Sequence, residues 1–187
     1  MGADWSGMES ALKKWFNDVG MVGSGDIKEP NKDNGKTAGK IADEYEKAMK
    51  KGMEMYGNKT DSFNPSAVKK AFKGAFDMLD ADKTGAMKSA AGAMMGAGFV
   101  ACWAGGTMKK SVPPPPSISV VSNVVMSPGA PIPVSIGGPT DDTGAFAGAI
   151  VNAAKSHAAT VAGLCTSKTP APGPTTPPMP YPWVGIF

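Results

Sequence analysis

The residues best suited to chemistry in this sequence are oxygen-bearing side chains at the end of a helical stretch, residues 71–87, "AFKGAFDMLDADKTGAM". Asp80, Asp82 and Thr84 stand at alternate positions, and Gly85 follows directly. Alternating oxygens followed by a glycine that permits a sharp turn are what a calcium-binding loop between two helices requires. The spacing therefore indicates a possible site for a divalent cation.

The second half of this loop lacks the ligands that calcium needs. Lys88 occupies the ninth position, where a water-binding oxygen is usual, and Ala91 occupies the twelfth, where a bidentate glutamate belongs. The stretch resembles the EF-hand family over about twelve residues, and its departures fall at these decisive positions. We therefore expect no metal ion here. The aspartates should end one helix, and a turn should lead into the next helix near Ala86.

Other groups with catalytic potential are sparse. His157, the only histidine, shares a predicted helix face with Phe146 and Ile150, which favours a packing role. Cys102 and Cys165 are the only cysteines and stand among apolar or small residues, so either two buried thiols or one disulfide is compatible with the sequence. No phosphate-binding loop or nucleophile elbow occurs. The sequence predicts a protein that is not an enzyme and has no cofactor or metal site.

The composition separates two regions of the chain. Of the 35 charged residues, 31 lie in residues 1–110, whereas 15 of the 17 prolines follow residue 110. All 19 basic residues are lysines. Specific nucleic-acid recognition relies on the planar guanidinium of arginine, so its absence argues against a nucleic-acid partner. We place the main boundary near Ser111.

Apolar periodicity predicts helices over residues 4–19, 37–56 and 142–164, with a further helix that begins at Pro65 behind an Asn64 cap. Asp141, Asp142 or Thr143 should cap the helix at 142–164. The β-branched run "SISVVSNVV" predicts a strand after the proline cluster at 113–116.

Residues 89–108 carry no charge and could in principle span a bilayer. The stretch consists mostly of alanine and glycine, which contribute little to membrane insertion. A central helix packed closely by its neighbours explains the same composition, so we expect the membrane to be an improbable partner.

These patterns predict a mainly α fold in four parts. Residues 1–110 form a helical domain, 111–140 a proline-rich extended arm with short β segments, 141–165 a further helix, and 166–187 a docked tail without regular structure. The tail ends in a cluster of apolar side chains, and exposed apolar clusters are rare in free tails. It should either cover its own helices or dock on neighbouring subunits, and we favour the neighbours.

The order of elements in residues 90–187 resembles small structural proteins of contractile tailed phages and related injection particles, particularly tail and baseplate components. The resemblance rests on a small-residue helix ending "GFVACWAGG", a proline-rich crossing, the helix "FAGAIVNAAKSHAATVAGL" and an aromatic tail. It implies a bacteriophage virion or phage-tail-like particle assembled from many copies, with synthesis in the bacterial cytoplasm. Residues 1–16 show no secretory signal pattern.

We therefore predict a structural protein that clamps other subunits of such a particle through protein–protein interaction. The expected contacts are Tyr181, Trp183, Ile186 and Phe187 in the tail and, by edge-strand pairing, Ile118, Val120 and Val121. Deletion of residues 170–187 should then leave the helices folded. The alternatives are a membrane-active protein that uses residues 89–108, a calcium-responsive module, and a cargo or effector carried by the particle.

Overall fold

The structure, a computed structural model, describes residues 2–18, 33–54, 57–82, 86–109, 119–127, 142–168 and 179–187; for 119–127, 165–168 and 179–181 it describes the backbone alone. The chain is mainly α, as the sequence predicts. The described helices are α1 (Ser6–Asp18), α2 (Asn34–Lys51), α3 (Pro65–Ala81), α4 (Lys88–Trp103) and α5 (Thr143–Ala158). The described strands are β1 (Lys59–Ser62), β2 (Thr107–Lys109), β3 (Ser119–Ser127), β4 (Ala162–Lys168) and β5 (Met179–Val184).

Aspartate side chains cap the first turns of α5 and α2. The Asp142 carboxylate accepts a hydrogen bond from the backbone N–H of Ala145 at 2.8 Å, so Asp142 is the cap among the three candidates. Asp33 caps α2 by accepting from the N–H of Lys36. Pro65 occupies the first turn of α3, where its missing N–H removes no helical hydrogen bond.

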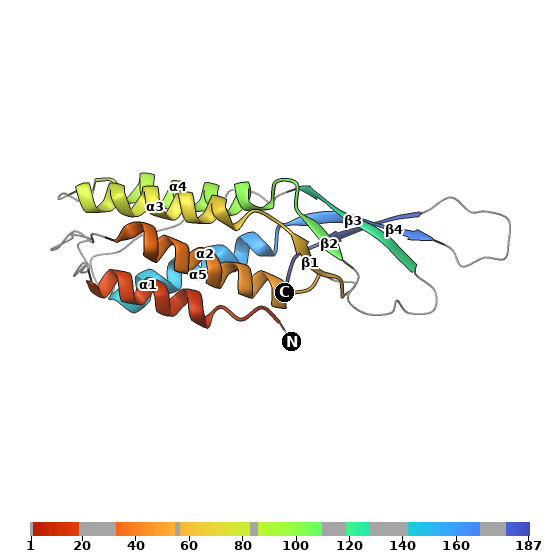
Figure 1. Cartoon of the computed structure of the whole chain (residues 1–187), viewed down its shortest axis with the longest axis horizontal. Helices are drawn as coiled ribbons and strands as arrows, with labels where there is room; N and C mark the ends of the chain where they lie inside the picture. The colour runs from red at the N-terminus through yellow and green to blue at the C-terminus, as the bar shows by residue number, and fades with distance from the viewer. Residues whose placement is uncertain are drawn as a thin grey trace.

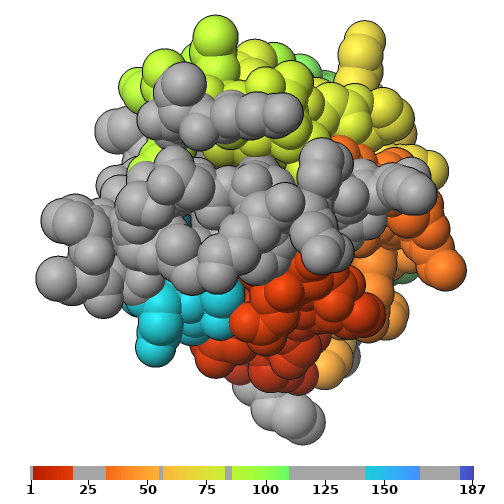
Figure 2. All heavy atoms as spheres, turned by 90° about the vertical axis from the view of Figure 1, so that its left-hand side faces the viewer, coloured from red at the N-terminus to blue at the C-terminus, as the bar shows by residue number. Residues whose placement is uncertain are grey.

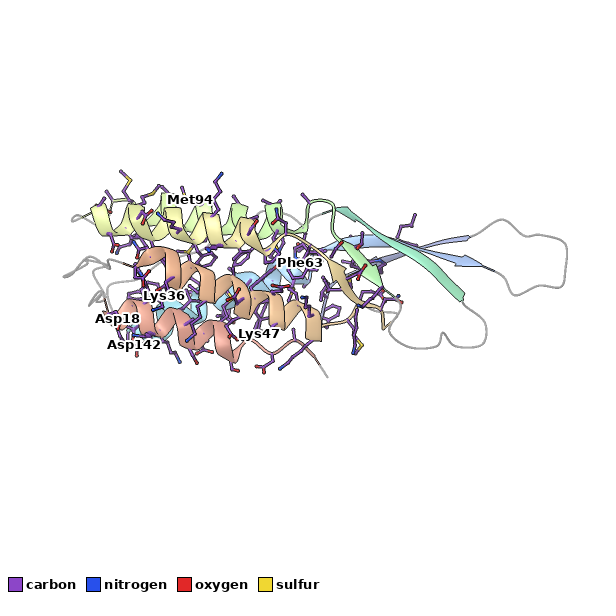
Figure 3. All side chains as sticks on the ribbon, viewed as in Figure 1. Asp18, Lys36, Lys47, Phe63, Met94 and Asp142 are labelled. Atoms are coloured by element: carbon purple, nitrogen blue, oxygen red, sulfur yellow. The ribbon has the colours of Figure 1, made fainter. Side chains whose placement is uncertain are left out.

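The five helices form a closed ring. Each helix packs against the next in sequence, and α5 returns to pack against α1. Seen along the bundle, α1 lies beside α5, with α3 and α4 on the opposite side (Figure 2). Exposed lysines such as Lys36 and Lys47 cover the outside of α2 (Figure 3). The amphipathic stripes read from the sequence therefore all face one enclosed core.

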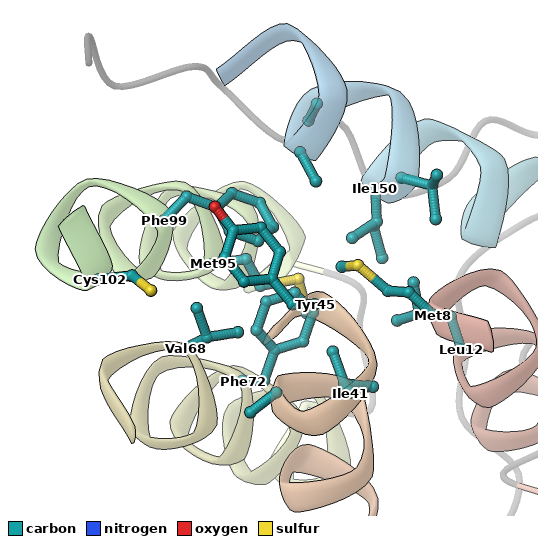
Figure 4. Close-up of a cluster of buried hydrophobic side chains, with 14 of the residues drawn as sticks. Met8, Leu12, Ile41, Tyr45, Val68, Phe72, Met95, Phe99, Cys102 and Ile150 are labelled. Atoms are coloured by element: carbon teal, nitrogen blue, oxygen red, sulfur yellow. The ribbon is translucent and has the colours of Figure 1, made fainter. Parts of the chain in front are cut away.

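The core is filled by side chains from every helix. Figure 4 shows Leu12, Ile41, Phe72, Phe99 and Ile150, one from each helix, converging on the same space. Aromatic rings contribute much of the contact, since such pairs add attraction beyond the apolar area that they bury. One hydrophobic cluster includes residues of α1 to α5 as well as Trp183 and Ile186, so the core is continuous across the boundary expected near residue 111.

The five strands form one antiparallel sheet in the order β1-β2-β3-β4-β5. β1 and β2 lie close to the ends of α2, α3 and α4, whereas β3 and β4 extend well beyond the helices (Figure 1). The sheet therefore has a part that joins the helical bundle and a part that projects from it. From here on, the helices with the strand ends that join them are called the body, and β3, β4 and β5 the projecting sheet.

Two predictions for the second half of the chain are wrong. The helix expected over 142–164 ends at Ala158, and Leu164, the last residue of the expected helix, lies in β4 instead. The tail expected to lack regular structure contains β5, which pairs with β4 from Ala162↔Val184 to Ser167↔Met179. Pairing with β4 supplies hydrogen bonds that no local pattern reveals, and this explains how a proline-containing segment forms a strand.

Backbone hydrogen bonds close the sheet where it meets the helices. The N–H of Met53 donates to the carbonyl of Phe187 at 2.9 Å, and the N–H of Phe187 donates to the carbonyl of Met53 at 3.0 Å. Met53 also forms an antiparallel bridge with Lys59 at the start of β1. The chain after β5 is thereby linked through Met53 to the opposite edge strand, so that both ends of the sheet are fastened to the body.

Candidate functional site

The carboxylates of the possible calcium loop are used in holding helices together. Asp82 accepts a hydrogen bond from the backbone N–H of Met87, at the entrance to α4. Asp80 accepts from the side-chain amide of Asn34 on α2. Ala91, at the position of the missing glutamate, is fully buried. Thr84 and Gly85 lie outside the described residues, and within the described part of the chain no cluster of possible metal ligands occurs.

A polar network that the sequence did not reveal joins three helices. The indole N–H of Trp15 on α1 donates to Asn34 Oδ1 at 2.9 Å, and Asn34 Nδ2 donates to Asp77 Oδ1 on α3 at 3.0 Å. The ammonium group of Lys73 pairs with Asp77, and its hydrogen bond lowers the pKa of that carboxyl. Buried indole and amide groups need such partners. This network joins α1, α2 and α3, and its Lys73–Asp77 pair lies at the surface.

Tyr45, Cys102 and His157 are buried in the core. The indole N–H of Trp103 donates to the hydroxyl of Tyr45 at 2.9 Å, and burial raises the pKa of that hydroxyl. Burial also raises the pKa of the Cys102 thiol, which favours the protonated form over the nucleophilic thiolate. His157 is fully buried and stacks on Phe99 with ring centroids 6.0 Å apart. These groups pack the interior, as predicted for His157.

The strand predicted as a contact element is β3, which lies between β2 and β4 in the sheet and extends beyond the helices (Figure 1). Within the described residues, β2 pairs with it at Val124 and Asn123. Its first residues, Ser119–Ser122, therefore have a described partner strand, β4, on one side only. This stretch contains Val120 and Val121, and Ile118 lies just outside the described residues. A strand edge of this kind can pair with another chain by backbone hydrogen bonds.

The pairing of β3 with β4 is irregular near the start of β3. The register between β3 and β4 skips Val121, which is the additional residue of a bulge between Val120 and Ser122. A bulge increases the local twist and weakens pairing with a further flat strand. Val120 and Val121 thus lie in the stretch of β3 for which a partner strand is described on one side only, and the bulge limits how far a further strand could pair there.

The outer edge of β5 is chemically different. The N–H of Gly185 donates to the carbonyl of Val161 at 2.8 Å, so the odd-numbered residues of β5 direct their backbone groups toward β4. The even-numbered residues direct theirs outward, and two of them, Pro180 and Pro182, have no N–H to offer. This edge is therefore protected against pairing, in contrast to the proline-free edge of β3.

The tail residues predicted to bind a neighbour are divided by the structure. Trp183 and Ile186 are buried in the core of their own chain, with exposed fractions of 1% and 3%. Trp183 lies over Gly163, where an added Cβ would approach the indole ring to 2.2 Å. Phe187 is 61% exposed, and the side chain of Tyr181 lies outside the described set. Residues 179–187 thus dock on their own chain, and Trp183 and Ile186 serve the fold.

The uncharged stretch 89–108 forms α4 and β2 rather than one long helix. None of the described helices combines the length and the apolar character needed to cross a bilayer. One side of α4 faces the core through Met95, Phe99 and Cys102. Its glycines allow close packing on α3, since a Cβ added to Gly98 would lie 2.5 Å from that of Ala71.

Comparisons with known proteins assign no family to the chain. No protein-family model matches the sequence, and no curated protein and no solved structure is similar enough to count as a match.

Proposed function

We propose that this chain is a non-enzymatic structural subunit of a multi-protein particle, in which the projecting sheet contacts a neighbouring subunit while the body holds the sheet in place. The observation that carries the proposal is the difference between two strands of the sheet. The outer edge of β5 lacks donors at Pro180 and Pro182, whereas Ser119–Ser122 of β3 contains no proline and, within the described residues, has a partner strand on one side only.

The attachment of the sheet supports a mechanical role. An arm transmits force or position only if its base is fixed, and here the base is fastened by the paired hydrogen bonds between Met53 and Phe187 and by the buried Trp183. The projecting strands then extend from a rigid bundle (Figure 1). Extended segments lose little backbone entropy when they bind, which suits contacts that form during assembly.

The particle that we propose is a phage virion or a phage-tail-like machine, on the basis of the resemblance of residues 90–187 to tail and baseplate proteins. The partners would be other subunits of that particle. Neither a nucleic acid nor a membrane is needed for this role.

Sedimentation of extracts from the producing cells tests the proposal. We expect the full-length chain to co-sediment with a particle much larger than the monomer and to occur there at a stoichiometric level by quantitative mass spectrometry. A chain found only in the slowly sedimenting fractions would contradict a structural role. Particles that assemble normally without the chain would instead identify it as cargo.

Variants of the two edges test the part played by the sheet. Lysine on an edge strand discourages pairing, so Val120→Lys combined with Val121→Lys should reduce incorporation into the particle while leaving the helical circular dichroism unchanged. Val184→Lys is the matched control, because Val184 is exposed and lies in the proline-protected strand. Equal incorporation of both variants would count against the β3 edge as the contact.

A further inference from the structure

The outward face of α4 differs from the exposed faces of the other described helices because it carries no charge. Its exposed residues include Ser89, Ala90, Ala93, Ala97 and Ala101. By contrast, α1 exposes Lys13 and Lys14, whose charges suit a permanently solvated surface. A charge-free helix face of alanines on a protein surface invites close approach by another helix, because no side chain keeps the two backbones apart.

A groove runs beside this face, between α3 and α4. Its volume is about 600 Å³, and small apolar residues dominate its walls: Ala67, Ala71 and Gly74 on α3, and Met94, Ala97, Gly98 and Ala101 on α4. Met94 is half-buried, and a flexible thioether adapts to an incoming surface. Lys70, Lys73 and Asp77 complete the lining, and Lys73 and Asp77 pair with each other.

We propose that this α3–α4 surface binds a second copy of the chain, with the two α4 helices antiparallel and each lying along the α3–α4 groove of the other copy. The surface contains a ridge of alanines immediately beside a groove of matching character. A two-fold axis places the ridge of each copy in the groove of its partner, which is the self-complementary arrangement that symmetric dimers use.

Charge favours a second copy over an unrelated helix. A helix with charged residues on all sides would bury an unpaired charge against the alanines, at considerable cost. The α4 helix has no charged residue between Lys88 and its end at Trp103. In an antiparallel pair, Lys88 of each copy comes to the C-terminal end of the partner's α4, where the helix dipole favours a cation. A parallel pair would bring the two Lys88 side chains together.

The size of the surface sets the strength of this contact. A 16-residue helix is about 24 Å long, and a strip of that length and about 10 Å in width is smaller than the roughly 800 Å² per partner of a stable interface. The dimer should therefore be reversible and concentration-dependent. The inference rests on the α3–α4 surface alone and is independent of the proposed particle, so a failure of one leaves the other in place.

Charge-swap variants at Ala97, near the middle of α4, test this dimer. Analytical ultracentrifugation of the full-length wild-type chain from micromolar to near-millimolar concentration should show a monomer–dimer equilibrium. Ala97→Glu and Ala97→Lys should each abolish the dimer, because two like charges meet near the two-fold axis. An equimolar mixture of the two variants should regain it, since a glutamate then faces a lysine.

Ala145→Glu is the matched control, since Ala145 is exposed in the first turn of α5, where an acidic residue is favourable. This variant should dimerise like the wild type, and circular dichroism should show all variants folded. A wild-type chain that stays monomeric at every concentration would overturn the proposal and leave the groove to a different partner. A dimer that tolerates both charges, or a mixture that stays monomeric, would overturn it as well.

Discussion

The body and the projecting sheet are stabilised by different interactions. In the body, side chains of five helices interdigitate around one core, and two hydrogen-bonded tryptophans, Trp15 and Trp103, join the helices. Among the strand side chains that the structure describes, only Met108 and Trp183 belong to that core. The described pairing of β3, β4 and β5 consists of backbone hydrogen bonds. Side-chain packing thus holds the body together, whereas backbone pairing joins the strands of the projecting sheet.

The largest effect on stability is expected for a substitution at Trp183, where the projecting sheet joins the body. Trp183→Ala should lower the free energy of unfolding by about 3–5 kcal/mol, because it removes a fully buried aromatic side chain. Chemical denaturation followed by circular dichroism measures this value. Val184→Ala, one residue further and exposed, should change it by less than about 0.5 kcal/mol. Equal effects of the two substitutions would show that the end of β5 is not part of the body.

A chain that lacks residues 170–187 should not keep its helices unaffected, in contrast to the prediction from the sequence. Deletion of residues 170–187 removes β5 together with Trp183 and Ile186, so the helices should lose stability rather than remain unaffected. Such a deletion is therefore unsuitable as a test of particle assembly, and point substitutions on β3 are preferable.

Within the body, two helical glycines should respond in opposite directions. Gly98→Ala places a methyl group 2.5 Å from the Cβ of Ala71, so overpacking of about 1–3 kcal/mol should outweigh the gain in helix propensity. Gly148→Ala meets no atom within 4 Å and should raise the free energy of unfolding by up to about 1 kcal/mol. Thermal unfolding of both variants measures the difference. A stabilised Gly98→Ala protein would mean that α3 and α4 lie further apart.

In the projecting sheet, the prolines of β5 should affect association more than stability. Replacement of Pro180 and Pro182 by threonine restores two outward N–H donors, and the opened edge should promote self-association. Light scattering in an Ala97→Glu background separates this effect from the proposed dimer. Pro65→Thr, at the start of α3, is the control. An unchanged association state would show that these prolines do not protect the edge.

The smallest effect on stability is expected for a substitution at Asp4, which lies just before α1. Hydrogen bonds from the side chain and backbone of Ser6, together with Lys51, lower the pKa of Asp4 from 3.8 to about 2. The depressed pKa means that the carboxylate contributes stability above pH 3.8, and that this contribution is lost as the pH falls through about 2. The stability difference between wild type and Asp4→Asn should therefore shrink over this range. A constant difference would contradict the pKa shift.

Helices with a strong apolar period were predicted well because the period is a local property of the chain. The stripe of Val68, Phe72 and Phe76 identified α3, and Asn64–Pro65 located its start. The β-branched run that contains Val120 and Val121 likewise predicted a strand, which is β3.

Strands that depend on distant partners were predicted poorly. Residues 162–164 continue the apolar pattern of α5, yet they leave the helix because β3 on one side and β5 on the other satisfy their backbone groups. The Trp15–Asn34–Asp77 network joins residues far apart in sequence, and no spacing rule connects them. The aromatic tail suggested a binding anchor. A segment that is buried within its own chain has the same apolar sequence as one that is buried against a neighbour, so the sequence does not distinguish the two.

The sequence by itself determined the mainly α class, the apolar faces of four helices, the charge-free stretch of α4 and the prolines of β5, since each depends on residues close together along the chain. Only the tertiary structure decided that the tail completes the core, that Met53 fastens the two ends of the sheet, and that β3 pairs with β4 through a bulge at Val121. These features arise from backbone hydrogen bonds and packing between distant segments, whose partners become known only once the chain has folded.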